Sequence, residues 1–267
     1  MLELTQQITD ITGKAGGSWG ISLFDLNNEE SWGQNEHRPF YAASIIKIPI
    51  MIAVFAAAER KEVNLKDTLI LEQEDIVGGC GVLQHMTPGI RLTIEDLVTL
   101  MIIQSDNTAT NMLIDFLGAQ EIQQTMKDIG LRQSNFFHKM MIGQRDSRRM
   151  NVVTADEMTV MLKNLYHGRI VSEYASSQML QILKKQQIRD SLPSKIRHLD
   201  KATGNLHWEL ANKTGNVPGI RHDIGLFSVG ERVIAVSVLS EGADDFTSAG
   251  TIGEIGLMIH KYLAQSL

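Results

Sequence analysis

The chain has 267 residues, of which 43% are hydrophobic and 21% are charged, and its formal net charge is −6. This balance is that of an ordinary globular protein and excludes a disordered chain. The negative charge, without any clustered Lys/Arg stripe, argues against a nucleic-acid partner. No apolar run approaches the ~20 residues of a membrane span, so we expect no membrane partner.

Two features bear on the cellular compartment. Cys80 is the only cysteine, so no internal disulfide can form. Met1–Lys14 is amphipathic, but it has neither a basic n-region nor a continuous apolar core and is not a signal peptide. We therefore expect a cytoplasmic protein if Met1 is the native start, and an extracytoplasmic one if a leader has been removed. Cys80 is interpreted as a small inert residue, with a reactive thiol lining a cleft as the alternative.

Strand patterns occur towards both ends of the chain, and helical patterns fill the middle. Strands are expected at Gly17–Asn27 and Ser31–Gln34, which form a hairpin, and at Trp208–Asn212, Asp223–Val229 and Arg232–Leu239. Helices are expected at Met1–Lys14, Ser44–Arg60, Thr93–Ile103, Thr108–Leu117, Ala119–Ile129, Ala155–His167, Glu173–Gln186 and Phe246–Ala264. Strands from both ends most simply pair in one antiparallel sheet. This predicts an α/β (α+β) lobe from residues 1–43 and 201–267, with an all-helical lobe from residues 44–200 inserted.

A serine and a lysine stand at the start of the first long central helix. Ser44 and Lys47 are three residues apart, which places them on one helix face about 5–6 Å apart at Cβ. A serine hydroxyl needs an adjacent base to become a nucleophile. The run that follows is apolar on nearly every side, so the helix is expected to be buried and the pKa of Lys47 lowered. The plain alternative is a helix N-cap serine followed by a surface lysine.

Two tripeptides extend this pattern. Ser105-Asp106-Asn107 follows a second apolar helix, and Lys213-Thr214-Gly215 is expected to end the strand Trp208–Asn212. Gly215 would permit the close approach of a ligand. Each tripeptide alone fits an ordinary helix-end turn or strand end. In the order Ser-x-x-Lys, Ser-Asp-Asn and Lys-Thr-Gly, the three form the signature of class A β-lactamases and penicillin-binding proteins.

The chain resembles the class A β-lactamase family along nearly its whole length. The similarity includes Leu83–Leu97, Ser105–Leu113 and the start of the helix at Asn151–Met158. It implies a β-lactamase/transpeptidase-like fold, in which an α/β lobe packs against a helical lobe and the active site lies at their junction.

The resemblance also implies roles for the matching residues. Ser44 would be the nucleophile, Lys47 its base or proton relay, and Ser105 the proton shuttle to the leaving nitrogen. The backbone N–H groups of Ser44 and Asn216 would form the oxyanion hole, each worth about 3–4 kcal/mol of the barrier. Asn107 would bind the substrate amide.

Substrate binding at the opposite end of the cleft is implied in the same way. Lys213 and Thr214, followed by Gly215, would bind a substrate carboxylate. Arg221 resembles a further carboxylate-binding arginine, although the segment from Lys213 to Arg221 departs in register from the family pattern. The alternative for Arg221 is an ordinary surface ion pair.

One stretch departs from the family. Where the family has Arg-x-Glu-x-x-Leu-Asn, this chain has Arg145, Ser147 and Asn151 at the arginine, glutamate and asparagine positions. Serine is no general base unaided, and Asp146 stands one position away. Because general-base assistance is worth about 10²–10⁴-fold, we expect normal acylation and impaired deacylation with penicillins.

Two further carboxylates follow this stretch. Asp156 and Glu157 are interpreted as occupied, because Thr154-x-x-Glu157 predicts a capping box for the next helix.

The pattern as a whole predicts a serine hydrolase that forms an acyl-enzyme on Ser44 with β-lactams or related amides and peptides. A penicillin-binding or D-alanyl peptidase-like activity and an intracellular esterase or amidase remain alternatives, as does a non-catalytic binding protein that keeps the cleft. The histidines show no ligand spacing, so no metal or cofactor is expected. The expected partner is a small-molecule substrate, and the chain is expected to be a monomer or weak dimer.

Overall fold

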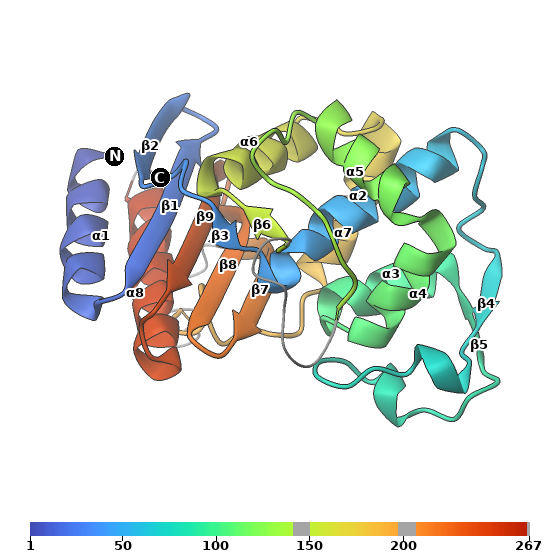
Figure 1. Cartoon of the computed structure of the whole chain (residues 1–267). Helices are drawn as coiled ribbons and strands as arrows, with labels where there is room; N and C mark the ends of the chain where they lie inside the picture. The colour runs from blue at the N-terminus through green and yellow to red at the C-terminus, as the bar shows by residue number, and fades with distance from the viewer. Residues whose placement is uncertain (141–149, 197–206, 266–267) are drawn as a thin grey trace.

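The computed structural model describes residues 1–140, 150–196 and 207–265. One sheet contains β1 (Ser18–Asp25), β2 (Glu30–Gln34), β7 (Trp208–Val217), β8 (Ile220–Val229) and β9 (Arg232–Glu241). The strand order is β2-β1-β9-β8-β7, and every neighbouring pair is antiparallel (Figure 1). The predicted pairing of strands from both ends of the chain is therefore confirmed.

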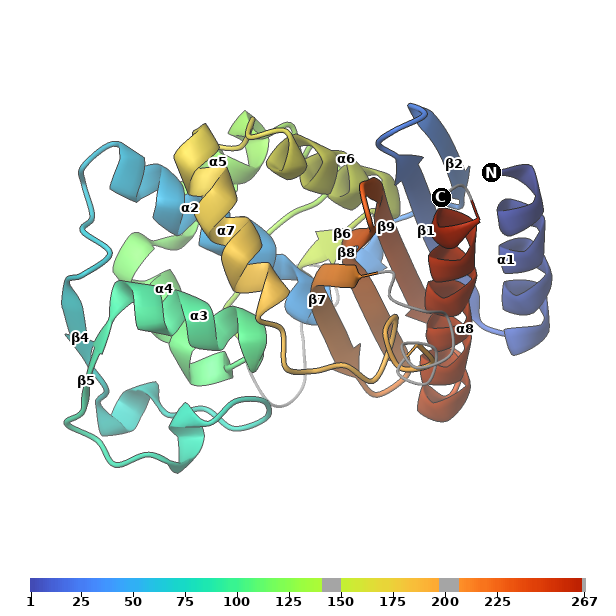
Figure 2. The same ribbon diagram turned by 180° about the vertical axis from the view of Figure 1, so that it is seen from behind.

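Helices cover both faces of this sheet. The terminal helices α1 (Leu2–Ala15) and α8 (Asp245–Ala264) lie side by side on one face (Figures 1 and 2). On the other face, α6 (Ala155–Tyr166) contacts β1, β8 and β9. Because it is covered on both sides, β9 is buried along nearly its whole length. Leu192 and Ile196 join the core under α1 and α8, ahead of the predicted lobe boundary at residue 200.

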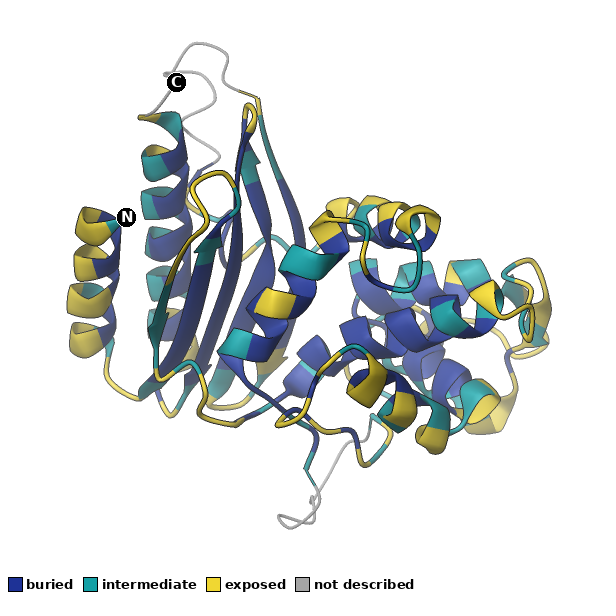
Figure 3. Cartoon of the chain, turned by 90° about the horizontal axis from the view of Figure 1, so that it is seen from above, coloured by how far each residue is buried: buried dark blue, intermediate teal, exposed yellow. Residues whose placement is uncertain are grey.

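The helical lobe is built around α2 (Lys47–Glu59). The helices that pack against α2 are α3 (Ile94–Ile103), α4 (Asn107–Leu117), α5 (Ala119–Asp128) and α7 (Glu173–Lys184). Every residue of α2 from Lys47 to Phe55 is buried, as Figure 3 shows by the dark central helix. A helix without a polar face has to be enclosed on all sides, so the prediction from its apolar sequence is confirmed.

Short elements connect these parts. β3 (Phe40–Tyr41) pairs with β6 (Val152–Val153), and β4 (Thr68–Ile70) pairs with β5 (Arg91–Thr93). The described residues also form the 3₁₀ turns η1 (Ala43–Ile46), η2 (Gln73–Asp75) and η3 (Leu83–His85). No helix in the described part of the chain is long and apolar enough to cross a bilayer.

The structure corrects the predicted capping box at the start of α6. Thr154 is the N-cap, and its hydroxyl accepts a hydrogen bond from the Glu157 N–H. The Glu157 carboxylate does not return to Thr154. It accepts hydrogen bonds of 2.7–2.8 Å from the backbone N–H groups of Arg132, Gln133 and Ser134. Glu157 is therefore occupied, as expected, but it fixes a distant loop rather than its own helix.

Candidate active site

The three sequence motifs meet where the sheet edge touches the helical lobe. η1 contacts β7, and the junction between α3 and α4 lies against the start of α2. A hollow of about 110 Å³ lies between them, and its lining includes Ser44, Ser105, Thr214, Gly215 and Asn216. The volume suits the reacting end of a substrate rather than a whole drug-sized ligand, which needs about 300–1,000 Å³.

Ser44 lies on the 3₁₀ turn η1, and the α-helix begins only at Lys47. The prediction that the helix starts at Ser44 is therefore wrong by one turn. Ala43, whose φ of +43° lies in the left-handed region, keeps the helical turn from extending past it towards the N-terminus. A 3₁₀ turn has about three residues per turn, so Ser44 and Lys47 still share one side.

β7 runs on to Val217 instead of ending at Asn212, because Thr214 pairs with Asp223 in the ladder with β8. The Lys-Thr-Gly motif is thus part of a strand, which corrects the predicted strand end. A Cβ on Gly215 would lie 3.2 Å from the Ala43 Cβ and 3.3 Å from the Ser44 nitrogen. The close approach that glycine permits is therefore made by the nucleophile turn of the chain itself.

The Lys47 amine is fully buried among oxygen acceptors. Its Nζ lies within hydrogen-bond distance of three oxygens: the Ser105 carbonyl at 2.7 Å, the Asn107 Oδ1 at 2.8 Å and the Ser105 Oγ at 3.2 Å. None of the hydrogen bonds found among the described residues joins it to Ser44. Burial first, and the neighbouring Lys213 second, hold the pKa of Lys47 well below its usual value. The neutral amine, which is the form that accepts a proton, is thereby favoured.

Lys213 approaches the same hydroxyl from the sheet. Its Nζ donates to the Ser105 Oγ at 3.1 Å and to the Thr214 carbonyl at 2.8 Å. Burial lowers the pKa of Lys213 to about 7. Ser105 therefore connects two lysine amines, and its φ of +52° is a strained value typical of functional positions. Such a hydroxyl can pass a proton between an amine and a reacting group.

Asp106, the middle residue of its motif, holds this arrangement in place. Its Oδ1 accepts a hydrogen bond from the Ala109 N–H and so caps α4. Its Oδ2 accepts from the N–H groups of Val82 at 2.7 Å and Leu83 at 2.8 Å. No role was predicted for Asp106 from the sequence, although an aspartate at the start of a helix is a common N-cap signal.

The glycine-rich stretch 78–81 forms one wall of the site. The Asn107 N–H donates to the Cys80 carbonyl at 3.0 Å, and the Asn107 Nδ2 donates to the Gly78 carbonyl at 3.1 Å. Cys80 is exposed and lines the same hollow as Ser44. Its position is that of the alternative interpretation, a thiol in the cleft wall.

Arg221 lines the hollow from β8, where it pairs with Asn216. Its guanidinium contacts Asp190 at 2.6 Å and Asp245 at 2.8 Å, and its Nε donates to the Ser191 Oγ at 3.2 Å. Arg221 is therefore in an ion pair, as the alternative interpretation expected, but its own side chain is buried and the sequence did not identify its partners.

His222, the residue after Arg221, was also missed. Its Nδ1 accepts a hydrogen bond from the Ser240 N–H at 3.1 Å, so its Nε2 carries the proton and donates to the Tyr41 carbonyl at 2.8 Å. Burial lowers the pKa of His222 to about 4, which keeps the ring neutral at physiological pH. The ring thus ties the strand that leads into Ser44 to the central sheet.

Of the named loop residues of the family pattern, Asn151 lies in the described part of the chain. Arg145, Asp146 and Ser147 lie outside the described residues. Asn151 is buried, and its side chain bonds the backbone of Phe137 and His138 at 2.7–3.2 Å. The Asn151 carbonyl also accepts from the N–H of Ala42 at 2.8 Å, so Asn151 anchors the approach to the nucleophile turn.

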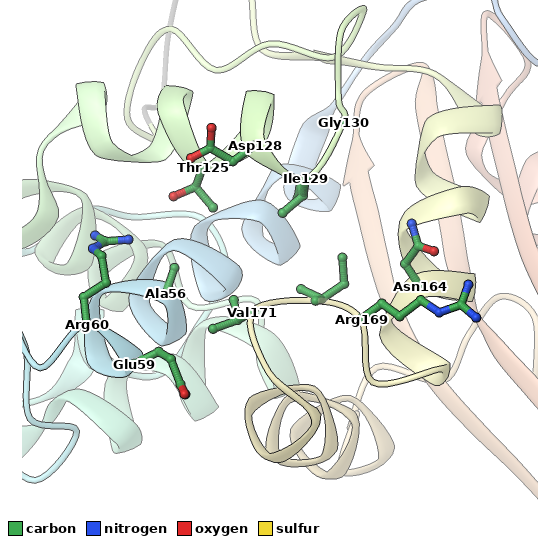
Figure 4. Close-up of a pocket in the computed structure, with 11 residues that line it drawn as sticks. Ala56, Glu59, Arg60, Thr125, Asp128, Ile129, Gly130, Asn164, Arg169 and Val171 are labelled. Atoms are coloured by element: carbon green, nitrogen blue, oxygen red, sulfur yellow. The ribbon is translucent and has the colours of Figure 1, made fainter.

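A larger hollow of about 630 Å³ lies elsewhere in the helical lobe, between the ends of α2 and α5 and residues 169–171 (Figure 4). Its Arg60 is paired with Glu62 and Glu121, and its lining includes none of Ser44, Lys47 and Ser105. It is therefore not the candidate active site. No group of His, Cys, Asp and Glu side chains suited to a metal ion occurs in the described ranges.

An antiparallel sheet flanked by helices, with a serine–lysine–serine cluster where it meets an all-helical lobe, defines a β-lactamase/transpeptidase-like fold. A profile of the Beta-lactamase enzyme family matches residues 3–263. The chain belongs to that family.

Solved structures agree with this assignment. A β-lactamase from Sphaerobacter thermophilus is 31% identical, with a TM-score of 0.89 over 98% of this chain and 97% of that chain. PBP-A is 25% identical, with a TM-score of 0.85 over 98% of this chain and 96% of that chain.

Among curated proteins, a β-lactamase of Rhodobacter capsulatus is 29% identical over 128 residues, which are 48% of this chain and 43% of that enzyme. The match thus spans less than half of that relative. Beta-lactamase L2 of Stenotrophomonas maltophilia is 23% identical over 251 residues, covering 88% of this chain and 78% of that enzyme. These similarities establish the family and the fold, not the substrate.

Proposed function

We propose that this protein is a serine hydrolase in which β-lactams or related amides, peptides and esters acylate Ser44. One observation carries the proposal: the Ser105 hydroxyl is bonded to the amines of both Lys47 and Lys213, in the hollow that Ser44 lines. A buried amine of lowered pKa beside a serine hydroxyl is the combination that nucleophilic catalysis requires.

In the proposed acylation, the Ser44 oxygen attacks the substrate carbonyl while its proton passes to the neutral amine of Lys47. The N–H groups of Ser44 and Asn216 would stabilise the oxyanion. When the scissile C–N bond breaks, the Ser105 hydroxyl gives its proton to the leaving nitrogen and receives one from the protonated Lys47. The acyl group then remains on Ser44, and both lysines return to their starting state.

Substrate contacts follow from the free hydrogen-bonding capacity of side chains in and next to the hollow. The Asn107 Oδ1 is occupied by Lys47, so its amide NH₂ group, which also bonds Gly78, would meet a substrate carbonyl. Thr214 would present its hydroxyl to the leaving-group side, with the Lys213 amine behind it.

Deacylation is proposed to be slow. Ser147 replaces the glutamate that activates water in the family pattern, and Asp190, the carboxylate among the described lining residues, is bound to Arg221. The structural similarity to PBP-A agrees with such penicillin-binding behaviour. A non-catalytic binding protein is less well supported, because the nucleophile, base and shuttle residues are all present.

The first experiment is intact-protein mass spectrometry over time after adding one equivalent of penicillin G. Wild-type protein should gain the mass of the drug and keep it, and Ser44→Ala should gain nothing. Cys80→Ser is the matched control, because Cys80 is a second nucleophile in the same hollow. An adduct that persists in Ser44→Ala and disappears in Cys80→Ser would refute Ser44 as the nucleophile. Rapid drug consumption without an adduct would refute slow deacylation.

A further inference from the structure

The glycine-rich wall of the site is held firmly against the start of α4. The Asn107 Nδ2 donates to the Gly78 carbonyl at 3.1 Å, and the Asn107 N–H donates to the Cys80 carbonyl at 3.0 Å. From the other side, the Gln84 Nε2 donates to the Gly79 carbonyl at 3.0 Å. A stretch whose composition suggests flexibility is therefore fixed in one place beside Asn107.

Gly79 can only be a glycine in this arrangement, for two separate reasons. Its φ of +99° is a backbone conformation that side chains other than glycine rarely adopt. A Cβ on Gly79 would also lie 2.6 Å from the Asn107 Nδ2, whereas ordinary contact needs about 3.5 Å. Either the Asn107 amide or the wall would have to move by about 1 Å, which would disturb the bond between Asn107 and Gly78.

The Gly78 carbonyl determines which way the Asn107 amide points. A carbonyl oxygen can only accept hydrogen bonds, so the NH₂ end of the amide has to face Gly78. The oxygen end then faces Lys47, whose Nζ lies 2.8 Å from the Asn107 Oδ1. The wall thus sets the orientation of a side chain that touches the proposed base.

This orientation decides where the lone pair of the neutral Lys47 amine points. A neutral amine has two N–H donors and one lone pair. The Ser105 carbonyl and the Asn107 Oδ1 can only accept, so they take the two N–H groups. The lone pair is then left to a hydroxyl, and the Ser105 Oγ lies at 3.2 Å. An Asn107 amide turned the other way would present its NH₂ group to this lone pair and occupy it.

We propose that Gly79 is a positioning residue for the acylation of Ser44, because its missing side chain lets the wall orient Asn107 and thereby the Lys47 amine. The inference rests on the proposed function, in which Lys47 takes the Ser44 proton. Gly79 is not among the described residues that line the hollow. It therefore acts through Asn107 and not by contact with the reacting atoms.

The test times the acylation of Ser44 by excess penicillin G with intact-protein mass spectrometry. Gly79→Ala should be acylated about 10- to 100-fold more slowly than wild type, because a displacement of about 1 Å at a catalytic group costs that much. If deacylation is fast, kcat/KM for consumption of the drug reports the same step. The fraction of chains that is finally labelled should match that of wild type, since loss of folded protein would lower this fraction instead of the rate constant.

Gly89→Ala is the matched control. The φ of Gly89 is +95°, so an alanine there brings nearly the same backbone strain as at Gly79. A Cβ on Gly89 would have no neighbouring heavy atom within 4 Å in the described part of the chain. This control should keep the acylation rate within about two-fold of wild type.

A double-mutant cycle shows whether Gly79 acts through Asn107. Asn107→Ala removes the amide that a Cβ on Gly79 would strike. In that background, Gly79→Ala should slow acylation no more than Gly89→Ala does. An equal slowing with and without the Asn107 amide would overturn the proposed route. If Asn107→Ala is acylated too slowly to time, the cycle is read from urea unfolding, where strictly additive effects of the two substitutions would overturn it.

A second variant covers the case in which Gly79→Ala does not fold. Gln84→Ala removes the hydrogen bonds to the carbonyls of Gly79 and Gly81, so it loosens the wall without adding a side chain. It should slow acylation by about three-fold. Its control is Gln124→Ala, which removes an exposed glutamine that bonds Asp128 on α5 and should leave the rate unchanged. Equal rates for these two variants would overturn the positioning role of the wall.

The outcomes separate the two proposals. If wild-type protein is acylated and Gly79→Ala is acylated as fast as Gly89→Ala, the role of Gly79 is overturned while acylation of Ser44 stands. If wild-type protein gains no adduct and consumes no drug, acylation by β-lactams is overturned and the role of Gly79 falls with it.

Discussion

Replacing Lys213 by methionine should raise the free energy of unfolding, and the gain should be larger at neutral pH than at alkaline pH. Burial lowers the pKa of Lys213 from 10.5, its ordinary value, to about 7. Between these two values the unfolded chain holds the lysine proton more tightly than the folded protein does. Burying this amine therefore costs free energy of folding. The cost is fully present below pH 7 and disappears above pH 10.5, the pKa of the amine in the unfolded chain. Methionine has a similar length and no such cost.

The size of the effect follows from the two pKa values. The cost of Lys213 to folding is about 4 kcal/mol at pH 7 and about 1 kcal/mol at pH 9.5, a change of about 3 kcal/mol. The lost hydrogen bonds to Ser105 and Thr214, about 1 kcal/mol each, do not depend on pH in this window and cancel in the difference. Lys213 also lowers the pKa of Lys47, so its removal adds to the change in the same direction.

Urea unfolding of wild type and Lys213→Met at pH 7 and pH 9.5, followed by circular dichroism, measures this change. Lys195→Met is the control, because Lys195 lies at the surface in a pair with Glu254 and should alter stability by less than about 0.5 kcal/mol. A difference between wild type and Lys213→Met that is the same at both pH values would show that the buried amine keeps its proton. The argument from desolvation would then be refuted.

Two further substitutions test other parts of the structure. Lys47→Met should slow acylation of Ser44 by about 10²–10⁴-fold in a mass-spectrometric time course, since it removes the base, and an unchanged rate would exclude Lys47 from that role. Glu157→Gln should lower the free energy of unfolding by about 2–3 kcal/mol, because it disturbs three backbone hydrogen bonds. The neighbouring Asp156→Asn, at a partly exposed carboxylate, should change it by less than about 0.5 kcal/mol, and equal effects of the two would contradict this account.

The main helices and the strands of the large sheet follow from local sequence, but several of their ends do not: β8, for example, begins at Ile220 rather than at the predicted Asp223. The all-round apolar run of α2 and the strands of the sheet are recognisable because hydrophobic pattern and length agree. The end of β7 was missed because Lys213 and Thr214 look like turn residues, and only the ladder with β8 makes them part of a strand. The start of α2 was missed because Ser44–Ile46 lead into the helix as a 3₁₀ turn, and helix propensity does not distinguish that turn from the first turn of an α-helix.

The candidate site was predicted through motifs, and its supporting contacts were not. Ser44, Lys47 and Ser105 are brought together as their spacing and order predicted. The acids that hold Arg221 could not be predicted, because an ion pair between distant segments has no local signature. His222 gave no signal for the same reason: its partners are backbone groups of β9 and of the strand before Ser44.

Backbone strain and buried amines, both of which cost free energy of folding, occur close to Ser44. Their position favours catalysis over a cleft that only binds. Ala43 and Ser105 have positive φ values, which cost of order 1–3 kcal/mol each, and the amines of Lys47 and Lys213 are buried without a carboxylate among their hydrogen-bond acceptors. Ser105 lines the hollow, Ala43 directly precedes Ser44 in its wall, and both amines are hydrogen-bonded to the Ser105 hydroxyl. A cleft that only binds gains nothing from a desolvated amine beside a serine, whereas an acyl-transfer site needs that amine in its neutral form. The strain and the lowered pKa values therefore favour an active hydrolase over a binding protein.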